Sequence, residues 1–177
     1  MLTLENSSLY VGLDDSNHGG TTQGEIIVAS FSFFHEDSIV RDYGTSKDDS
    51  RVSKWFEQGE GKRNLRYCIL TNERFRRGNQ NLVYAAPYLV NDFLKTCQQK
   101  IDSLKIYLDG NMFRESKIAL RKEFEPGVNS FVVDNFRKEQ KLHHCPFVIY
   151  ASHVLSNAIL NQDYTVIKPD KIVNVPD

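Results

Sequence analysis

An apolar segment near the start of the chain, Leu9–Leu13, ends in two adjacent carboxylates, Asp14 and Asp15. Paired carboxylates at the end of a buried strand are a common foundation for a divalent metal site, because Mg²⁺ and Mn²⁺ favour oxygen ligands. The polar residues that continue to Gly24 are also typical of an ordinary turn. The pair by itself therefore leaves both a metal site and a turn open.

Two later apolar segments also end in a carboxylate, since Leu104–Leu108 precedes Asp109 and Phe131–Val133 precedes Asp134. The carboxyl ends of parallel strands meet at the same edge of a sheet. If these strands run parallel to the first, all the acids belong to one edge. Each later acid also has an ordinary interpretation, because Asp-Gly and Asp-Asn are frequent in turns.

The first part of the chain is rich in strand patterns. Glu25–Phe34 is β-branched and aromatic, with phenylalanines alternating against serines. Its short polar connection to Leu9–Leu13 predicts an antiparallel hairpin. Arg66–Leu70 has the pattern of a buried strand, and Ile39–Tyr43 gives a weaker strand signal.

The helical patterns come later. Asn81–Thr96 carries an apolar stripe at helical period, and Pro87 within it predicts either a kink or a helix start nearby. Pro146 precedes a second stripe, so a helix is predicted over Phe147–Leu160. Shorter helices are predicted within residues 44–61 and over Lys117–Phe124. Together the elements predict an α/β fold, a mixed sheet of about five strands flanked by helices.

The bulk properties narrow the class of protein. A chain of 177 residues with 40% hydrophobic residues fits a single domain over residues 1–177. The net charge of −1 gives no global attraction to nucleic acid or to an acidic membrane. Neither a signal peptide nor a membrane span is recognisable, and Cys68, Cys97 and Cys145 lack metal-ligand spacing. We expect a soluble cytoplasmic protein with no membrane partner, and the oligomeric state stays open.

The order of these elements resembles type 2 ribonuclease H. Gly12–Asp15 is similar to the Gly-Ile-Asp-Glu of that family, and Thr45–Lys47 resembles its Ser-Lys loop. The family's strand, asparagine-containing segment, long helix and Asp-Gly strand end correspond in order and spacing to Arg66–Gly110. Tyr150–Ser156 is similar to its Ala-Ala-Ser-Ile-Leu-Ala helix. The resemblance covers Leu9–Leu160 and implies a ribonuclease H-like fold.

The resemblance also implies an activity. It implies a metal-dependent nuclease that hydrolyses phosphodiester bonds in RNA or structured nucleic acid at a two-metal carboxylate site loaded with Mg²⁺ or Mn²⁺. RNA or an RNA/DNA hybrid is then the expected partner. The metal ligands it implies are Asp14 as the bridging acid with Asp15 and Asp109, and the catalytic set adds Asp134. The residues it places at the substrate are Asn17, His18, Gly19, Lys47 and His153.

The chain departs from the family's pattern at three places. Asn17–Gly19 replaces the Gly-Arg-Gly loop that grips the ribose 2′-hydroxyl at an RNA–DNA junction, and Asp15 is one methylene shorter than the family's glutamate. His143 and His144 stand where the fourth acid is expected, so either Asp134 fills that role across an insertion or the site has three acids with or without a histidine. Two histidines just before Pro146 more often belong to a solvated loop ahead of a helix. Two alternatives therefore stay open: a catalytically inactive ribonuclease H-like module that binds nucleic acid or protein, and a hydrolase of small phosphate esters.

A local basic cluster in this otherwise neutral chain has two interpretations. Its members are Lys62, Arg63, Arg66, Arg74, Arg76 and Arg77. They could neutralise phosphates, while the nearby Tyr67, Phe75 and Tyr84 could stack on bases. The other interpretation is a solvated basic surface beside core aromatics.

Overall fold

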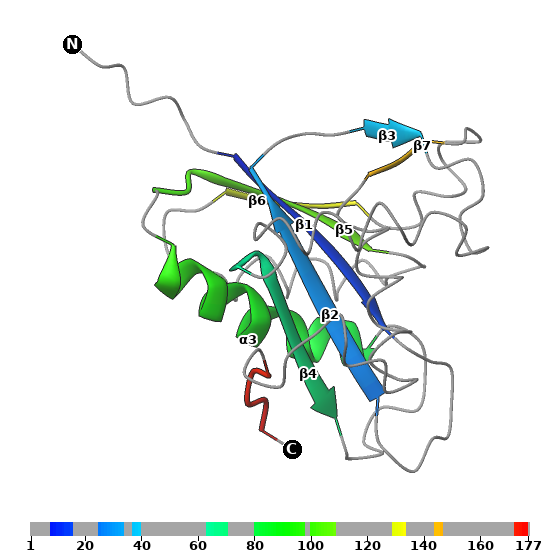
Figure 1. The fold of residues 1–177 in the computed structure, drawn as a ribbon, viewed down its shortest axis with the longest axis vertical. Helices are drawn as coiled ribbons and strands as arrows, with labels where there is room; N and C mark the ends of the chain where they lie inside the picture. Colours follow the sequence, from blue (N-terminus) through cyan, green and yellow to red (C-terminus); the bar gives the residue numbers. More distant parts are fainter. Residues whose placement is uncertain are drawn as a thin grey trace.

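The computed structural model describes residues 8–15, 25–33, 37–39, 63–70, 80–97, 100–108, 129–133, 144–146 and 172–176. Their centre is a five-stranded mixed sheet in the order β4-β2-β1-β5-β6 (Figure 1). Its strands are β1 (Ser8–Asp15), β2 (Glu25–Ser32), β4 (Leu65–Leu70), β5 (Ser103–Leu108) and β6 (Asn129–Val133). The helix α3 (Gln80–Thr96) packs against β1, β2 and β4. The fold is α/β, as predicted.

The strand β1 joins the antiparallel and parallel parts of the sheet. It pairs antiparallel with β2, where Leu13 lies opposite Ala29, and parallel with β5, where Leu13 lies opposite Leu108. The strand β6 pairs parallel with β5, so that Tyr107 lies opposite Val133. The predicted hairpin is confirmed, and the three acid-terminated segments run parallel, which was the condition for one common edge.

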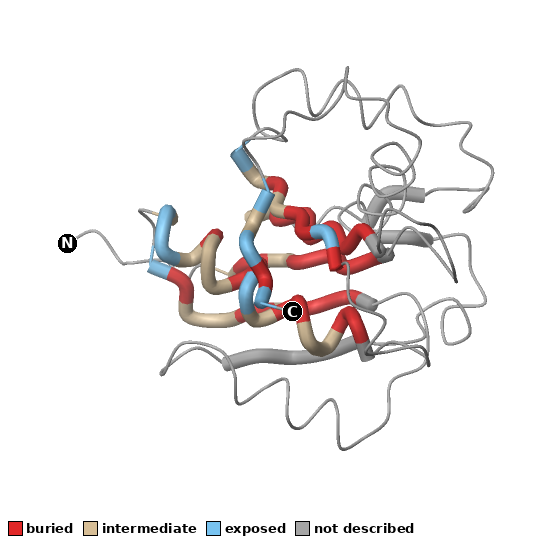
Figure 2. Tube along the Cα trace, turned by 90° about the horizontal axis from the view of Figure 1, so that it is seen from below, coloured by how far each residue is buried: buried red, intermediate tan, exposed pale blue. Residues whose placement is uncertain are grey.

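The helix α3 covers one face of the sheet because its apolar residues recur at helical spacing. The buried stripe consists of Leu82, Ala85, Ala86, Leu89, Val90 and Phe93. It meets alternate residues of the strands in one hydrophobic core, and the rings of Phe31 and Phe93 stack with centroids 4.0 Å apart. Figure 2 shows the buried stretches of the strands and of α3 gathered in the middle of the described part. The helix begins at Gln80 and continues through Pro87, so this proline does not mark its start.

A second, two-stranded sheet pairs β3 (Asp37–Ile39) antiparallel with β7 (His144–Pro146) (Figure 1). One prediction is wrong here. The histidine His144 belongs to a strand and not to a loop, and Pro146 is the last residue of that strand. Only Ile39 of the predicted strand Ile39–Tyr43 lies in β3, and residues 40–43 lie outside the described residues. This pairing joins segments about 100 residues apart, which a local pattern does not encode.

The helices predicted within residues 44–61, over Lys117–Phe124 and over Phe147–Leu160 lie outside the described residues. Cys68 belongs to the hydrophobic core, as predicted, and Cys97 packs against it. No helix in the described part of the chain is long and apolar enough to cross a membrane.

Candidate functional site

The carboxylate of Asp14 lies near the end of β1 and is buried, with 5% of the residue exposed. The residues Leu9, Val11 and Leu13 belong to the core beneath α3. Because successive side chains of a strand point to opposite faces, Asp14 lies on the sheet face away from α3. A buried carboxylate costs several kcal/mol unless hydrogen bonds, a cation or a metal ion compensates it, with about 2–7 kcal/mol typical even for a neutral polar group. This position is therefore unlike an exposed turn.

Two buried residues of the neighbouring strands lie near Asp14 on the same sheet face. The residue paired with it on β2 is Val28, which is fully buried, and paired residues share a sheet face. On the other side, β5 contributes Tyr107, which is also buried and lies opposite Gly12. Gly12 has no side chain, so it leaves room for the ring of Tyr107 beside β1. Low polarity around a carboxylate strengthens its attraction to a cation.

Sequence reasoning did not single out Tyr107, which lies on the same sheet face as Asp14. The ammonium Nζ of Lys105, two residues earlier on β5, lies 5.4 Å from the centroid of its ring. This distance is within the range of a cation–π contact. The only sequence signal for the pair is the alternation within β5, which puts Lys105 and Tyr107 on one face.

The parallel strands β1, β5 and β6 present their carboxyl ends at one edge of the sheet. Leu13 pairs with Leu108 and Tyr107 pairs with Val133 at this edge. Asp109 and Asp134 are the next residues of the sequence after β5 and β6, and both lie outside the described residues. The structure describes the backbone of Asp15 within β1 but not its side chain. Among the side chains that the structure does describe, no three of His, Cys, Asp or Glu are grouped to hold a metal ion.

The remaining residues predicted at the substrate are also not placed. They are Asn17, His18, Gly19, Lys47 and His153, all outside the described residues. Asp14 is thus the predicted site residue whose side chain the structure describes.

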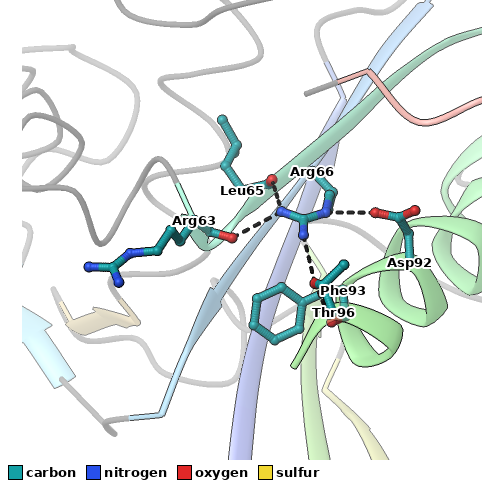
Figure 3. Close-up of polar contacts among 6 residues, drawn as sticks. All are labelled: Arg63, Leu65, Arg66, Asp92, Phe93 and Thr96. Atoms are coloured by element: carbon teal, nitrogen blue, oxygen red, sulfur yellow. Dashed lines mark hydrogen bonds and ion pairs between the residues drawn. The ribbon is translucent and has the colours of Figure 1, made fainter. Parts of the chain in front are cut away.

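One member of the basic cluster, Arg66, uses its guanidinium to bond to other residues of the fold (Figure 3). Its Nε donates to Asp92 Oδ2 of α3 at 2.7 Å, and one terminal nitrogen donates to Thr96 Oγ1 at 3.0 Å. The other terminal nitrogen donates to the carbonyls of Arg63 and Leu65. A guanidinium has five N–H groups, and these bonds occupy four of them. The guanidinium also lies 5.5 Å from the ring centroid of Phe93.

These contacts tie β4 to the end of α3, so the phosphate-binding role considered for Arg66 is wrong. The base-stacking role considered for Tyr67 is also wrong, because this residue is only 1% exposed. Tyr84 is half-buried and its hydroxyl donates to the carbonyl of Pro176. Arg63 is exposed, and the other members of the cluster lie outside the described residues.

Replacing Arg66 with lysine is expected to lower the free energy of unfolding by about 1–3 kcal/mol, because a lysine cannot make the fork of bonds to Asp92, Thr96 and the carbonyls. Denaturant unfolding measures this loss. Arg63→Lys is the matched control, because it makes the same change at an exposed side chain, and it should change stability by no more than about 0.5 kcal/mol. Equal stabilities of the two variants would contradict the structural role of Arg66.

Comparison with solved structures identifies the fold. The chain matches ribonuclease H2 from Pyrococcus horikoshii OT3 at 13% identity and a TM-score of 0.54, over 89% of this chain and 74% of that one. It matches the RNase HII of a PCNA:RNase HII complex from Archaeoglobus fulgidus at 13% identity and a TM-score of 0.51, over 92% and 77% of the two chains. A mutant of Bst-RNase HIII matches at 11% identity and a TM-score of 0.57, over 90% of this chain and 53% of that one.

The chain therefore has a ribonuclease H-like fold, as the sequence resemblance implied. No protein-family model matches the sequence, and no curated protein matches it significantly. At identities of 11–13% the likeness concerns the fold, and the chain spans about half of the Bst-RNase HIII that it matches.

Proposed function

We propose that this chain is a metal-dependent nuclease that hydrolyses phosphodiester bonds in RNA or in a structured nucleic acid. The observation that carries the proposal is the burial of Asp14 at the carboxyl end of β1, where the parallel strands β5 and β6 end at the same sheet edge. In open α/β sheets this edge is where ligands bind. The solved structures that share the fold are ribonucleases by their names, which supports the same class of activity here.

The proposed metal ligands are Asp14, Asp15 and Asp109, with Asp134 as the fourth acid. The donor chemistry of Asp14 fits Mg²⁺ or Mn²⁺, because hard cations prefer carboxylate oxygens and burial strengthens the attraction between opposite charges. A pair of such ions would stabilise the charge on the attacking and leaving oxygens of a phosphodiester. The acid at position 14 would hold its place because its strand is hydrogen-bonded on both sides, to β2 and to β5.

Nucleic acid, RNA or an RNA/DNA hybrid, is the proposed substrate. The net charge of −1 requires a local contact surface for such a polyanion. We propose that exposed Arg63 and the later arginines of the basic cluster provide the phosphate contacts. Because Asn17–Gly19 replaces the Gly-Arg-Gly loop, we do not propose selectivity for an RNA–DNA junction.

The test is cleavage of end-labelled oligonucleotides by the full chain. The substrates are an RNA/DNA hybrid, single-stranded RNA, a hairpin RNA and duplex DNA of the same sequence, with Mg²⁺, with Mn²⁺ and with EDTA. We expect cleavage of at least one RNA-containing substrate that EDTA abolishes. Cleavage of none of them, in either metal, by a chain that binds metal and remains folded would refute the nuclease proposal.

The alternative is a binding module that has lost catalysis, and the substitution at Asn17–Gly19 favours it. The same oligonucleotides distinguish the two functions. A module without catalysis would shift their mobility or anisotropy without cutting them. A nuclease would cut them, and its affinity would fall as salt is raised.

A further inference from the structure

The last described segment, Ile172–Pro176, occupies the edge of the sheet beside β4. Ile172 forms a parallel β-bridge with Tyr67, and the amide of Val173 donates to the carbonyl of Tyr67 at 2.8 Å. Since β4 lies at one end of the sheet order, this contact adds backbone pairing to an edge strand. Figure 1 shows the segment, in red, beside α3 and β4.

The side chains of the segment alternate as those of a strand do. Val175 is 8% exposed and belongs to the hydrophobic core, and Val173 packs against the same core. Ile172 and Asn174 are exposed. The hydroxyl of Tyr84 on α3 donates to the carbonyl of Pro176, which holds the end of the segment. The segment therefore pairs its backbone with the edge of β4 and places alternate apolar side chains in the core, at the seam between α3 and β4.

We propose that this seam is a peptide-binding groove whose resident ligand is Ile172–Pro176. The groove takes an extended peptide with two β-branched apolar residues two positions apart, followed by proline. Recognition is by strand addition, in which main-chain hydrogen bonds supply affinity and pockets for alternate side chains supply specificity. A separate peptide with the same pattern binds in the groove when Ile172–Pro176 is released from it.

The resident segment is held by fewer described contacts than the strands of the sheet. Its described contacts include the bridge of Ile172, the hydrogen bond of the Val173 amide, the bond from Tyr84, and the core packing of Val175 and partly buried Val173. The central strands are paired along their length on both sides. Segments with few buried contacts open locally without global unfolding. Release of Ile172–Pro176 therefore leaves the sheet and α3 in place.

The test uses the full chain carrying Val175→Asp, which places a charge in the apolar core and releases the segment. A fluorescein-labelled peptide with the sequence Lys-Ile-Val-Asn-Val-Pro-Asp is titrated and followed by anisotropy. We expect the variant to bind this peptide at least tenfold more tightly than the wild type, whose groove is filled. Ile172→Asp is the matched control, because it puts the same charge at an exposed position of the segment, and it should bind like the wild type.

Two results of this titration would overturn the proposal. One is absence of peptide binding by a folded Val175→Asp variant. The other is equal binding of a control peptide in which the second valine is replaced by aspartate.

A second measurement on the wild type covers the case in which Val175→Asp does not fold. Hydrogen exchange should show the Val173 amide exchanging at least tenfold faster than the amides shared by β1 and β2. Exchange of Val173 at the same rate as those amides would show that the segment opens only with the whole sheet, and the groove would have no exchangeable ligand. The seam lies at β4 and Asp14 lies on β1. Neither result therefore bears on the nuclease proposal, which the cleavage assay tests separately.

Discussion

Replacing Asp14 with asparagine is expected to abolish the binding of Mn²⁺ and to lower any nucleic-acid cleavage by at least about 100-fold. Even residues that only support metal ligands change metal affinity or activity by about 10–100-fold, so loss of a proposed bridging ligand should cost more. Asparagine keeps the shape of the buried side chain and removes its charge. The wild type and the variant should be compared by calorimetric titration with Mn²⁺ and by initial cleavage rates.

Thermal unfolding gives an independent measure of the same site. A metal that binds only the folded chain stabilises it by about 2.7 kcal/mol at 100 times its Kd. For a chain of this length that corresponds to a rise in Tm of about 5–10 °C. We expect this rise in the wild type and none in Asp14→Asn.

Asp102→Asn is the matched control for these experiments. Asp102 is a surface acid that lies 3.7 Å from exposed Lys100, before the start of β5. The same chemical change there should leave Mn²⁺ affinity and the metal-induced rise in Tm within about twofold of the wild type, since exposed ion pairs contribute about 0–1 kcal/mol. If both variants bound metal as the wild type does, Asp14 would not be a ligand.

Replacing Phe93 with alanine is expected to destabilise the chain by about 3–5 kcal/mol, the usual cost of removing a buried aromatic ring. The ring is buried, stacks on Phe31 and lies against the guanidinium of Arg66. Its removal leaves a cavity between α3 and β2 and weakens the environment of that guanidinium. Thermal unfolding should show a fall in Tm of about 6–20 °C.

Tyr88→Ala is the matched control for Phe93→Ala, because it removes an exposed aromatic ring from the same helix. Tyr88 is exposed, and its described ring contact is a tilted one with Tyr84. Such a pair contributes about 0.5–1.5 kcal/mol, so the control should lower the unfolding free energy by clearly less than Phe93→Ala does. Similar losses in the two variants would mean that the Phe93 ring is not part of the core.

Local patterns in the sequence were sufficient for the strands of the five-stranded sheet and for α3. The stripe over Asn81–Thr96 predicted α3 to within one residue at its start, because a helix with one buried face must repeat its apolar residues every three or four positions. The segments Leu9–Leu13 and Leu104–Leu108 predicted β1 and β5, although the strands extend further. The short strand β7 was missed, because three residues carry too little pattern to outweigh the helix signal at Pro146.

The candidate site was predictable in part for a related reason. An apolar run that ends in an acid is a local feature, and parallel pairing of three such strands brings their carboxyl ends to one edge of the sheet. The sequence therefore indicated Asp14 and its edge. The surroundings of Asp14 were not predictable, because Val28 and Tyr107 come from strands on either side whose register the local pattern does not contain.

The sequence by itself determined which segments form the main sheet and α3 and which face of each is apolar, because these depend on neighbours within a few residues. Only the tertiary structure decided what those faces and ends meet. It directed Arg66 to Asp92 of α3 and away from solvent, and it brought Ile172 beside Tyr67 from the far end of the chain. Such contacts join residues that are distant in sequence. They depend on how the whole chain packs. A basic side chain that is buried in this packing needs a partner that compensates its charge.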